Sequence, residues 1–244
     1  MIRVLCTLLC LSIAPLARAE VVVFAAASLK EPLDAMAAEF GDVVVSYGGS
    51  GTLARQVSMG APVDVVLLAN PEWMDVLVDG GHVRPEAVDI ASNALVLIGP
   101  ADMADVPLTS EGIGAALNGD RMALGLTNAV PAGIYAKAAL VSLGLWDGVA
   151  DQLAEVDNVR SALALVARGQ APLGVVYATD ARVSDAVRIV ARFPADSHPP
   201  IRYLAALTPT ADAKAADFVA FLTGPTGQGA LAQAGFLPPA KAAQ

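Results

Sequence analysis

Short apolar runs alternate along the chain with stretches in which apolar residues recur at helical spacing. An apolar run of about four to eight residues between turn signals is typical of a buried strand. Runs of this kind predict strands at Val21–Ala25, Val43–Tyr47, Asp64–Leu68, Ala94–Ile98, Met122–Leu126, Leu173–Tyr177, Ala186–Val190 and Ile201–Leu207.

The stretches between these runs predict helices. Residues spaced so that they share one helix face include Leu29, Leu33, Met36 and Phe40, and, near the C-terminus, Ala215, Phe218 and Leu222. Strands that alternate with helices in this way indicate an α/β fold with a mostly parallel sheet.

Two proline-marked breaks interrupt the alternation. Gly99-Pro100 ends a predicted strand and is followed by polar sequence without clear periodicity, and Ser197–Pro200 precedes the last predicted strand. We interpret the breaks as the two crossings of an inserted lobe. This predicts a first lobe of residues 20–98 and 201–244 and a second lobe of residues 99–200. The alternative is one continuous sheet with two turns that contain proline.

The first 19 residues have the pattern of a secretory signal peptide. Arg3 is followed by the apolar stretch VLCTLLCLSIAPLA and then by Ala17-Arg18-Ala19, an A-x-A cleavage pattern ahead of Glu20. The apolar stretch is too short for a membrane-spanning helix, and no later segment is long and apolar enough for one. We therefore expect export, with cleavage after Ala19.

Cleavage would change the composition of the chain. The 244 residues include 15 basic and 24 acidic side chains, a net charge of −9, and two cysteines. Because Arg3, Cys6, Cys10 and Arg18 leave with the signal peptide, the mature chain keeps 13 basic residues, has a net charge of −11 and can form no disulfide. A nucleic-acid-binding protein needs a basic surplus, so the composition excludes that function.

The first strand ends in a turn of small residues, VVVFAAASLKE at residues 21–31. Ser28-Leu29-Lys30-Glu31 matches the capping box S-x-x-E, in which both polar side chains bond free amides at a helix start. One interpretation of Ser28 is therefore an N-cap, with Ala25–Ala27 small because the strand and the helix pack closely. The other interpretation is a contact to a ligand.

The same design recurs at three later turns. They are SYGGSGTLARQ (46–56), with a helix near Ser50, TNAVPAGIYAK (127–137), with a helix from Pro131 or Ala132, and EVDNVRSALALVARG (155–169), with a helix from Asp157–Val159. Helix starts offer unpaired N–H groups and a positive dipole end, and in an open α/β sheet they gather at one edge. The turns predict an anion site of helix starts and hydroxyl groups.

The net negative charge does not exclude such a site. Repulsion of a small anion is screened beyond about 8 Å at physiological ionic strength, whereas each hydrogen bond to a charged group contributes about 1.5–3 kcal/mol at contact. No lysine or arginine precedes these helix starts, although Lys30, Arg55 and Arg160 follow closely. The predicted donors are therefore amides and hydroxyls.

Several segments, in order along nearly the whole mature chain, carry a more specific signal. They are FAAASL, GSGTLARQ, GAPVDVVLLAN with PEWMD, VPAGIYAKAAL, VRSALALV and APLGVVYATD. In these segments the chain resembles the periplasmic molybdate-binding proteins, the solute receptors of molybdate ABC importers. The resemblance implies a two-lobed periplasmic-binding-protein fold of type II, with mixed, mostly parallel sheets, crossover strands and a ligand cleft between the lobes.

The resemblance also implies which residues bind the ligand. Ser28 and Ser50 would supply hydroxyl and amide donors from the first lobe, Ala132 and Val159 backbone amides from the second, and Tyr177 its phenolic hydroxyl. Molybdenum would be present only as the bound oxyanion, held by these five residues. The resemblance implies a receptor without cofactor or catalysis.

Such a receptor would bind molybdate, and tungstate of nearly equal size and charge, and deliver it to an inner-membrane ABC permease. We expect a periplasmic monomer. A site of donors alone favours a fully deprotonated tetrahedral dianion, because phosphate near neutral pH keeps a proton that needs an acceptor. Asp157 and Arg160 lie near the predicted site in the sequence, and their roles stay open at this stage.

Two alternatives remain. One is a receptor for another small ligand on the same fold, such as sulfate, phosphate, ferric iron or an organic anion. The other is a serine hydrolase: Gly48-x-Ser50-x-Thr52 lies between strand and helix but lacks the second glycine of G-x-S-x-G, and a triad would need His82 or His198. The sequence has no P-loop and no spacing typical of a zinc site.

Overall fold

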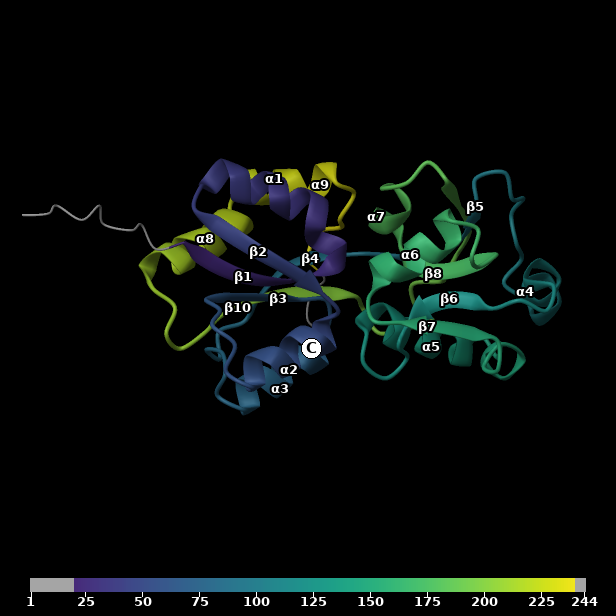
Figure 1. Cartoon of the computed structure of the whole chain (residues 1–244), viewed down its shortest axis with the longest axis horizontal. Helices are drawn as coiled ribbons and strands as arrows, with labels where there is room; N and C mark the ends of the chain where they lie inside the picture. Colours follow the sequence, from purple (N-terminus) through teal and green to yellow (C-terminus); the bar gives the residue numbers. More distant parts are fainter. Residues whose placement is uncertain (1–19, 240–244) are drawn as a thin grey trace, which may run out of the picture.

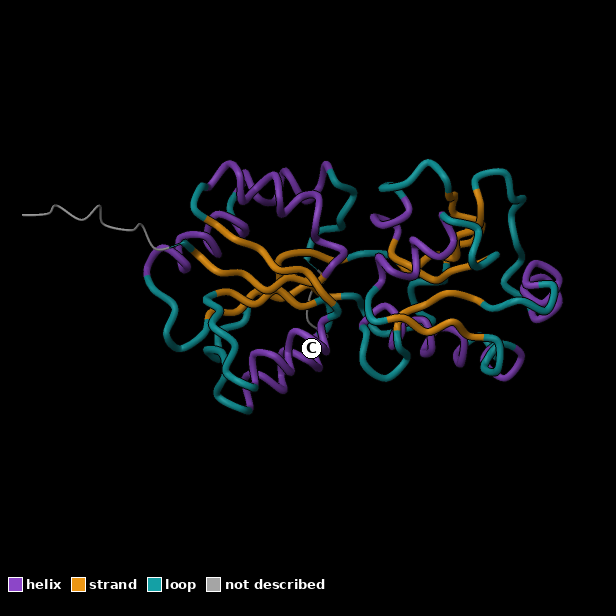
Figure 2. The backbone as a smooth tube through the Cα atoms, in the orientation of Figure 1, coloured by secondary structure: helices purple, strands orange, loops and turns teal. Residues whose placement is uncertain are grey.

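The computed structural model describes residues 20–239, which fold into two lobes lying side by side (Figure 1). The predicted signal peptide, residues 1–19, lies outside the described residues. Each lobe is built on a five-stranded sheet with helices packed against it (Figure 2). The predicted two-lobed α/β fold is therefore confirmed.

The sheet of the first lobe has the strand order β2-β1-β3-β10-β4. β1 pairs in parallel with β2 and β3, whereas β10 is antiparallel to β3 and β4, so four of the five strands run the same way. The strands are β1 (Val21–Ala26), β2 (Val43–Gly48), β3 (Val65–Leu68), β4 (Val88–Ser92) and β10 (Arg202–Leu207). The helices are η1 (Ala27–Leu29), α1 (Lys30–Phe40), α2 (Ser50–Ser58), α3 (Pro71–Asp79), α8 (Ala213–Thr223) and α9 (Pro225–Gln233).

The second lobe repeats this design with the strand order β7-β6-β8-β5-β9. β6 pairs in parallel with β7 and β8, and β5 is the strand that runs against the others. The strands are β5 (Leu95–Pro100), β6 (Met122–Gly125), β7 (Leu153–Val156), β8 (Leu173–Tyr177) and β9 (Val187–Arg192). The helices are α4 (Ser110–Leu117), α5 (Pro131–Ser142), η2 (Trp146–Gly148), α6 (Val159–Ala167) and α7 (Ala178–Ala181).

Helices cover both faces of the first sheet, and this explains its sequence pattern. Side chains of α1, α8 and α9 belong to one buried cluster, and side chains of α2 and α3 to another. The central strand β3 is consequently buried at every residue and reads as the unbroken apolar run VVLL. The edge strand β2 instead alternates between half-buried and exposed residues along most of its length.

Two strands, β4 and β7, were not predicted. Their sequences, VDIAS and LAEV, contain no apolar run long enough to indicate a buried strand. Both are edge strands: β4 begins with one exposed and one half-buried residue, and the residues of β7 are all half-buried or exposed. Both are held in place by pairing with a neighbouring strand rather than by an apolar pattern of their own.

The chain crosses between the lobes twice. β4 ends in the first sheet and β5 begins in the second, so the first crossing is at Asn93-Ala94. The boundary predicted between residues 98 and 99 is thereby corrected: Gly99-Pro100 ends β5, still paired with β9, and does not mark a change of lobe. The return crossing lies in residues 193–201, between β9 and β10, and includes the predicted Ser197–Pro200.

Candidate ligand-binding site

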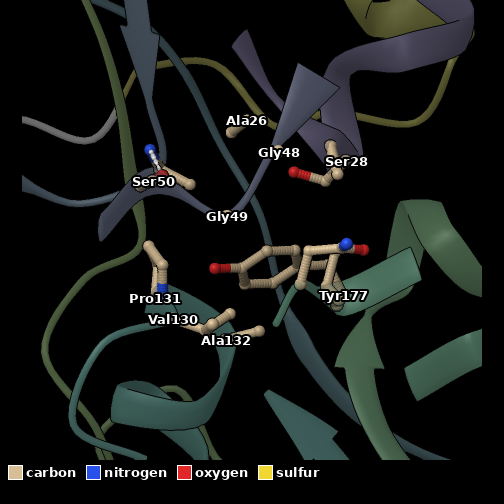
Figure 3. A pocket seen from close by; sticks show the side chains of 13 residues that line it. Ala26, Ser28, Gly48, Gly49, Ser50, Val130, Pro131, Ala132 and Tyr177 are labelled. Carbon is tan, nitrogen blue, oxygen red and sulfur yellow. Dashed lines mark hydrogen bonds between the residues drawn. The ribbon is translucent and has the colours of Figure 1, made fainter. Parts of the chain in front are cut away.

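A small cavity lies between the lobes, where strand ends meet helix starts (Figure 3). The centre of a water-sized sphere can move within only about 10 Å³ of it, so the lobes leave room for no more than a small solute. None of its lining residues is a lysine, arginine, histidine, aspartate or glutamate. The lining residues are Ala26, Ala27, Ser28, Gly48, Gly49, Ser50, Ala69, Val130, Pro131, Ala132, Asn158, Val159 and Tyr177.

All five residues predicted to bind a ligand line this one cavity. Ser28 and Ser50 come from the first lobe, and Ala132, Val159 and Tyr177 from the second. Each of the five is buried in the protein. The structure thus brings together residues that are far apart in the sequence, while their role in binding stays a prediction.

Three of the four helix starts predicted from the sequence lie at the cavity, and the fourth position, after β1, is a short 3-10 turn instead of an α-helix start. The 3-10 turn η1 follows β1, α2 begins directly after Gly49, α5 begins at Pro131, and α6 begins at Val159 with the Asn158 side chain as its N-cap. The first N–H groups of a helix have no partner within it, and the helix dipole makes this end positive. The cavity is therefore polarised to receive negative charge although it contains no cationic side chain.

The hydroxyl group of Ser50 is oriented by the backbone. The Ala69 N–H donates to Ser50 Oγ at 3.1 Å, in a buried contact. Because Ser50 Oγ acts as the acceptor there, its own hydrogen is left available to the cavity.

The hydroxyl group of Tyr177 has no hydrogen-bond partner, although it is buried. Figure 3 shows it directed into the space between Gly49 and the start of α5. Burial raises the pKa of Tyr177 well above its usual value, so the group keeps its proton and is a donor. A buried donor without a partner is costly, and an acceptor inside the cavity would satisfy it.

The capping-box interpretation of Ser28 is wrong. α1 begins at Lys30, after the 3-10 turn, and its N-cap position is Leu29, which makes no side-chain cap. The Ser28 hydroxyl instead lies 2.8 Å from the hydroxyl of Tyr203, and the Glu31 carboxylate bonds Arg160. The ion pair and the buried hydroxyl contact replace both bonds of the capping box.

Backbone contacts close the lobes around the cavity. A Cβ atom on Gly49 would lie 2.2 Å from the Asp157 carbonyl oxygen, and one on Gly51 would lie 2.5 Å from the Ala129 carbonyl oxygen. The same Ala129 oxygen accepts a hydrogen bond of 2.9 Å from the Trp73 indole N–H. Only glycine allows the two backbones to approach this closely.

A charged group lies beside the cavity, and we call Glu31, Arg160 and Asp180 the Arg160 cluster. Arg160, on α6, donates to Glu31 on α1 at 2.6 Å and to the buried Asp180 at 2.5 Å. It therefore joins the two lobes. Arg160 also donates to the Ser28 carbonyl oxygen at 3.3 Å, and the other Asp180 oxygen accepts from the Tyr177 N–H at 3.1 Å.

The two carboxylates of the Arg160 cluster differ in their surroundings. Complete burial raises the pKa of Asp180 to about 6, against the opposing charge of Arg160. Burial also favours a higher pKa for Glu31, but the hydrogen bonds and charge of Arg160 outweigh it and lower the pKa of Glu31. Arg160 thus lies outside the cavity and acts as an ion-pair partner. The sequence alone had left its role open.

Asp157 is also turned away from the cavity. Its carboxylate accepts hydrogen bonds from the Asn158 side chain at 3.0 Å and from the Ser161 hydroxyl at 2.9 Å. Only its backbone, which faces Gly49, contributes to the wall between the lobes.

Among residues 20–239, the hydrogen-bond partner of Ser50 Oγ is the Ala69 N–H and not a histidine, as the hydrolase alternative would need. The cavity lining contains no histidine, and His198 instead contacts the Pro199 carbonyl oxygen and the ring of Tyr135. Within residues 20–239, no three His, Cys, Asp or Glu side chains are grouped so that they could hold a metal ion. The same residues include no helix long and apolar enough to cross a membrane.

Two residues near the site were missed by sequence reasoning. Tyr203, on β10, contacts Ser28, and Asn93, at the first crossing, contacts Tyr203. For Tyr203, the available signal was a hydroxyl group within the apolar strand IRYLAAL. For Asn93, it was a polar residue between two strands. Neither signal indicates its partner, because the contacts join residues more than a hundred positions apart.

Comparison with known proteins agrees with this geometry. The family model described as "Bacterial extracellular solute-binding protein" matches residues 21–237. The molybdate-binding protein ModA of Escherichia coli is 41% identical over 221 residues, which are 84% of each chain. That of Haemophilus influenzae is 41% identical over 230 residues, 90% of this chain and 91% of the relative.

Solved structures show the same architecture. The periplasmic molybdate-binding protein of Azotobacter vinelandii superposes with a TM-score of 0.78 and 26% sequence identity, over 91% of this chain and all of that one. The fold of this solved structure and the two sequence relatives place the chain in the same family. The chain belongs to the family of bacterial extracellular solute-binding proteins that includes these molybdate-binding proteins.

Proposed function

We propose that this protein binds molybdate in the cavity between its lobes and delivers it to an ABC importer. The observation that carries the proposal is a cavity between the lobes without charged side chains, into which the unpartnered Tyr177 hydroxyl and several helix starts are directed. The two relatives at 41% identity are molybdate-binding proteins, which supports this ligand. Ser28, Ser50, Ala132, Val159 and Tyr177 would hold the oxyanion.

The donor character of the cavity favours a fully deprotonated tetrahedral dianion. Backbone amides and the hydroxyls of Ser50 and Tyr177 all offer hydrogens. Molybdate can accept at every oxygen, whereas phosphate near neutral pH carries a proton that would face these donors. Tungstate has nearly the same size and charge as molybdate, and we expect it to bind as well.

The proposed receptor works by binding alone, without a cofactor. The exported chain would begin at Glu20, after cleavage behind Ala19, and act in the periplasm as a monomer. Its closed form would dock on an inner-membrane permease. The extracellular family to which the chain belongs supports this location.

Calorimetric titration of the exported chain with molybdate tests the proposal. We expect one-to-one binding that excess phosphate does not displace, and competition with sulfate measures whether the cavity also selects by the size of the anion. Ser50→Ala should weaken binding about ten- to a hundredfold, because a hydrogen bond to a charged group contributes about 1.5–3 kcal/mol. Ser161→Ala is the matched control, since that hydroxyl bonds Asp157 and does not line the cavity.

Two results would contradict the proposal. Tighter binding of sulfate or phosphate than of molybdate would keep the receptor and replace its ligand. Absence of heat with every oxyanion would mean that the helix starts serve the fold alone.

A further inference from the structure

A hydrogen-bonded chain of side chains lies behind Ser28, outside the cavity lining. The Tyr203 hydroxyl lies 2.8 Å from Ser28 Oγ, and the Asn93 side-chain nitrogen lies 3.4 Å from the same Tyr203 hydroxyl. Tyr203 and Asn93 are both buried. Tyr203 belongs to β10 of the first lobe, and Asn93 to the first crossing between the lobes.

The orientation of the Asn93 amide is fixed by its neighbours. Its oxygen accepts from the Ala94 N–H at 2.9 Å, and its nitrogen donates to the Thr179 hydroxyl at 2.9 Å. The amide nitrogen therefore faces Tyr203. Because an NH₂ group has hydrogens but no acceptor site, the hydrogen of the Tyr203 hydroxyl cannot be given to Asn93.

The remaining acceptor for the Tyr203 hydrogen, among the contacts of the described residues, is Ser28 Oγ. If Ser28 were the donor, the hydrogen of a fully buried phenol would have no acceptor, and leaving a buried donor unpaired is unfavourable. A phenol is also a stronger acid than an aliphatic alcohol and hence the better donor. Tyr203 thus donates and Ser28 accepts.

This direction determines what Ser28 presents to a ligand. With its oxygen engaged by Tyr203, Ser28 has its own hydrogen available for the cavity, and Figure 3 shows its side chain on the cavity side of the turn. We propose that Tyr203 is a specificity-determining residue, which holds the Ser28 hydroxyl as a donor and so selects against oxyanions that carry a proton. This role rests on the proposed binding of an oxyanion in the cavity.

Tyr203→Phe tests the role with little change in packing. The ring has edge contacts to Tyr177 and Phe236, with centroids 5.9 and 5.2 Å away, and phenylalanine keeps both. Asn93 keeps its bond to Thr179. Tyr135→Phe is the matched control, because Tyr135 is equally buried but its hydroxyl contacts the Ala69 carbonyl oxygen instead of Ser28.

The measurement is the affinity of each variant for molybdate and for phosphate, by competition calorimetry near pH 7, with thermal melting as the check on folding. In Tyr203→Phe the Ser28 hydrogen is no longer held toward the cavity, so the hydroxyl can turn and accept from a protonated oxyanion. We expect molybdate to bind about three- to tenfold more weakly and phosphate to bind at least about threefold more tightly, so that phosphate competes measurably. The preference for molybdate should fall at least about tenfold, whereas Tyr135→Phe should change both affinities by a similar factor.

A folded Tyr203→Phe whose preference stays within twofold of the wild type would overturn the role. Failure of phosphate to compete with molybdate in Tyr203→Phe, at the highest concentration used for the wild type, would overturn it too. Failure of the wild type to bind molybdate is a different result, which removes the proposed function and this role with it.

Discussion

The cavity and the Arg160 cluster are neighbouring polar regions on the same boundary between the lobes, and they are built in opposite ways. The cavity is lined without a single charged side chain, whereas the cluster consists of three. Ser28 belongs to both regions, because its hydroxyl faces the cavity and its carbonyl oxygen accepts from Arg160.

The difference indicates that the neutral donors of the cavity and the charged side chains of the cluster have separate roles. Neutral donors recognise an anion by the directions of their hydrogens, so they can distinguish a proton-free oxyanion from one that carries a proton. A cationic side chain would attract both. Charges instead join the lobes outside the cavity, where Glu31 is about half exposed and the ion pair can open reversibly.

The largest effect is expected from Gly49→Ala, which breaks the cavity without removing any side-chain donor. The added Cβ would lie 2.2 Å from the Asp157 carbonyl oxygen, so the lobes could not reach the observed contact. Loss of two or more hydrogen bonds, each worth about 1.5–3 kcal/mol with a charged ligand, should weaken molybdate binding at least about a hundredfold by calorimetry.

Gly114→Ala is the control for this substitution, because a Cβ on Gly114, in α4, meets no atom within 4 Å. It should leave the affinity unchanged. If Gly49→Ala bound molybdate within tenfold of the wild type, the backbone contact at the cavity would not govern closure.

A smaller effect is expected from Glu31→Gln, which breaks the Arg160 cluster and leaves the cavity intact. Glu31 is the partner of Arg160 on the opposite lobe, so its loss should lower the barrier to opening. We expect molybdate to dissociate about three- to tenfold faster in stopped-flow displacement, in line with a partly exposed bidentate ion pair.

Asp34→Asn is the matched variant for Glu31→Gln. Both remove one negative charge from α1 at a similarly exposed position, but Asp34 pairs with Lys30 on the same helix. Its dissociation rate should equal that of the wild type. Equal rates in the two variants would show that net charge, and not the contact between the lobes, sets the rate.

The smallest effect is expected from salt. Raising the ionic strength from about 0.05 to 0.5 M shortens the Debye length several-fold and screens partly exposed ion pairs. Dissociation from the wild type should become about twofold faster, and the effect should vanish in Glu31→Gln. If the dissociation rates of the wild type and of Glu31→Gln depended equally on salt, the ion pair between Glu31 and Arg160 would not be the interaction that salt screens.

The sequence predicted the parts of the fold that local pattern determines. Apolar runs identified central strands such as β3 and β8, because strands covered on both faces must be apolar throughout. The same criterion missed β4 and β7, whose pairing with a neighbour compensates for weak patterns. It also misplaced the first crossing, because the apolar run of β5 continues to Gly99-Pro100 without signalling which sheet it joins.

The sequence predicted residues that line the candidate site, but not the residues that orient or flank them. Ser28 was identified from the turn at the end of a strand and Tyr177 from the resemblance to a known family, and both line the cavity. The partners that orient or flank them, Tyr203, Asn93 and Glu31 with Arg160, come from distant parts of the chain. Contacts of this kind depend on how the lobes meet, and the local spacing of residues along the chain does not predict that.

The position of β10 has a consequence for the order in which the chain can fold. All five strands of the second sheet come from the continuous stretch 95–192, whereas the first sheet receives β10 between β3 and β4 only after that stretch. The second lobe can therefore complete its sheet while the first still lacks an inner strand. Pairing across so long a separation in sequence is slow, so assembly of the first lobe should limit the rate at which a receptive cavity is formed.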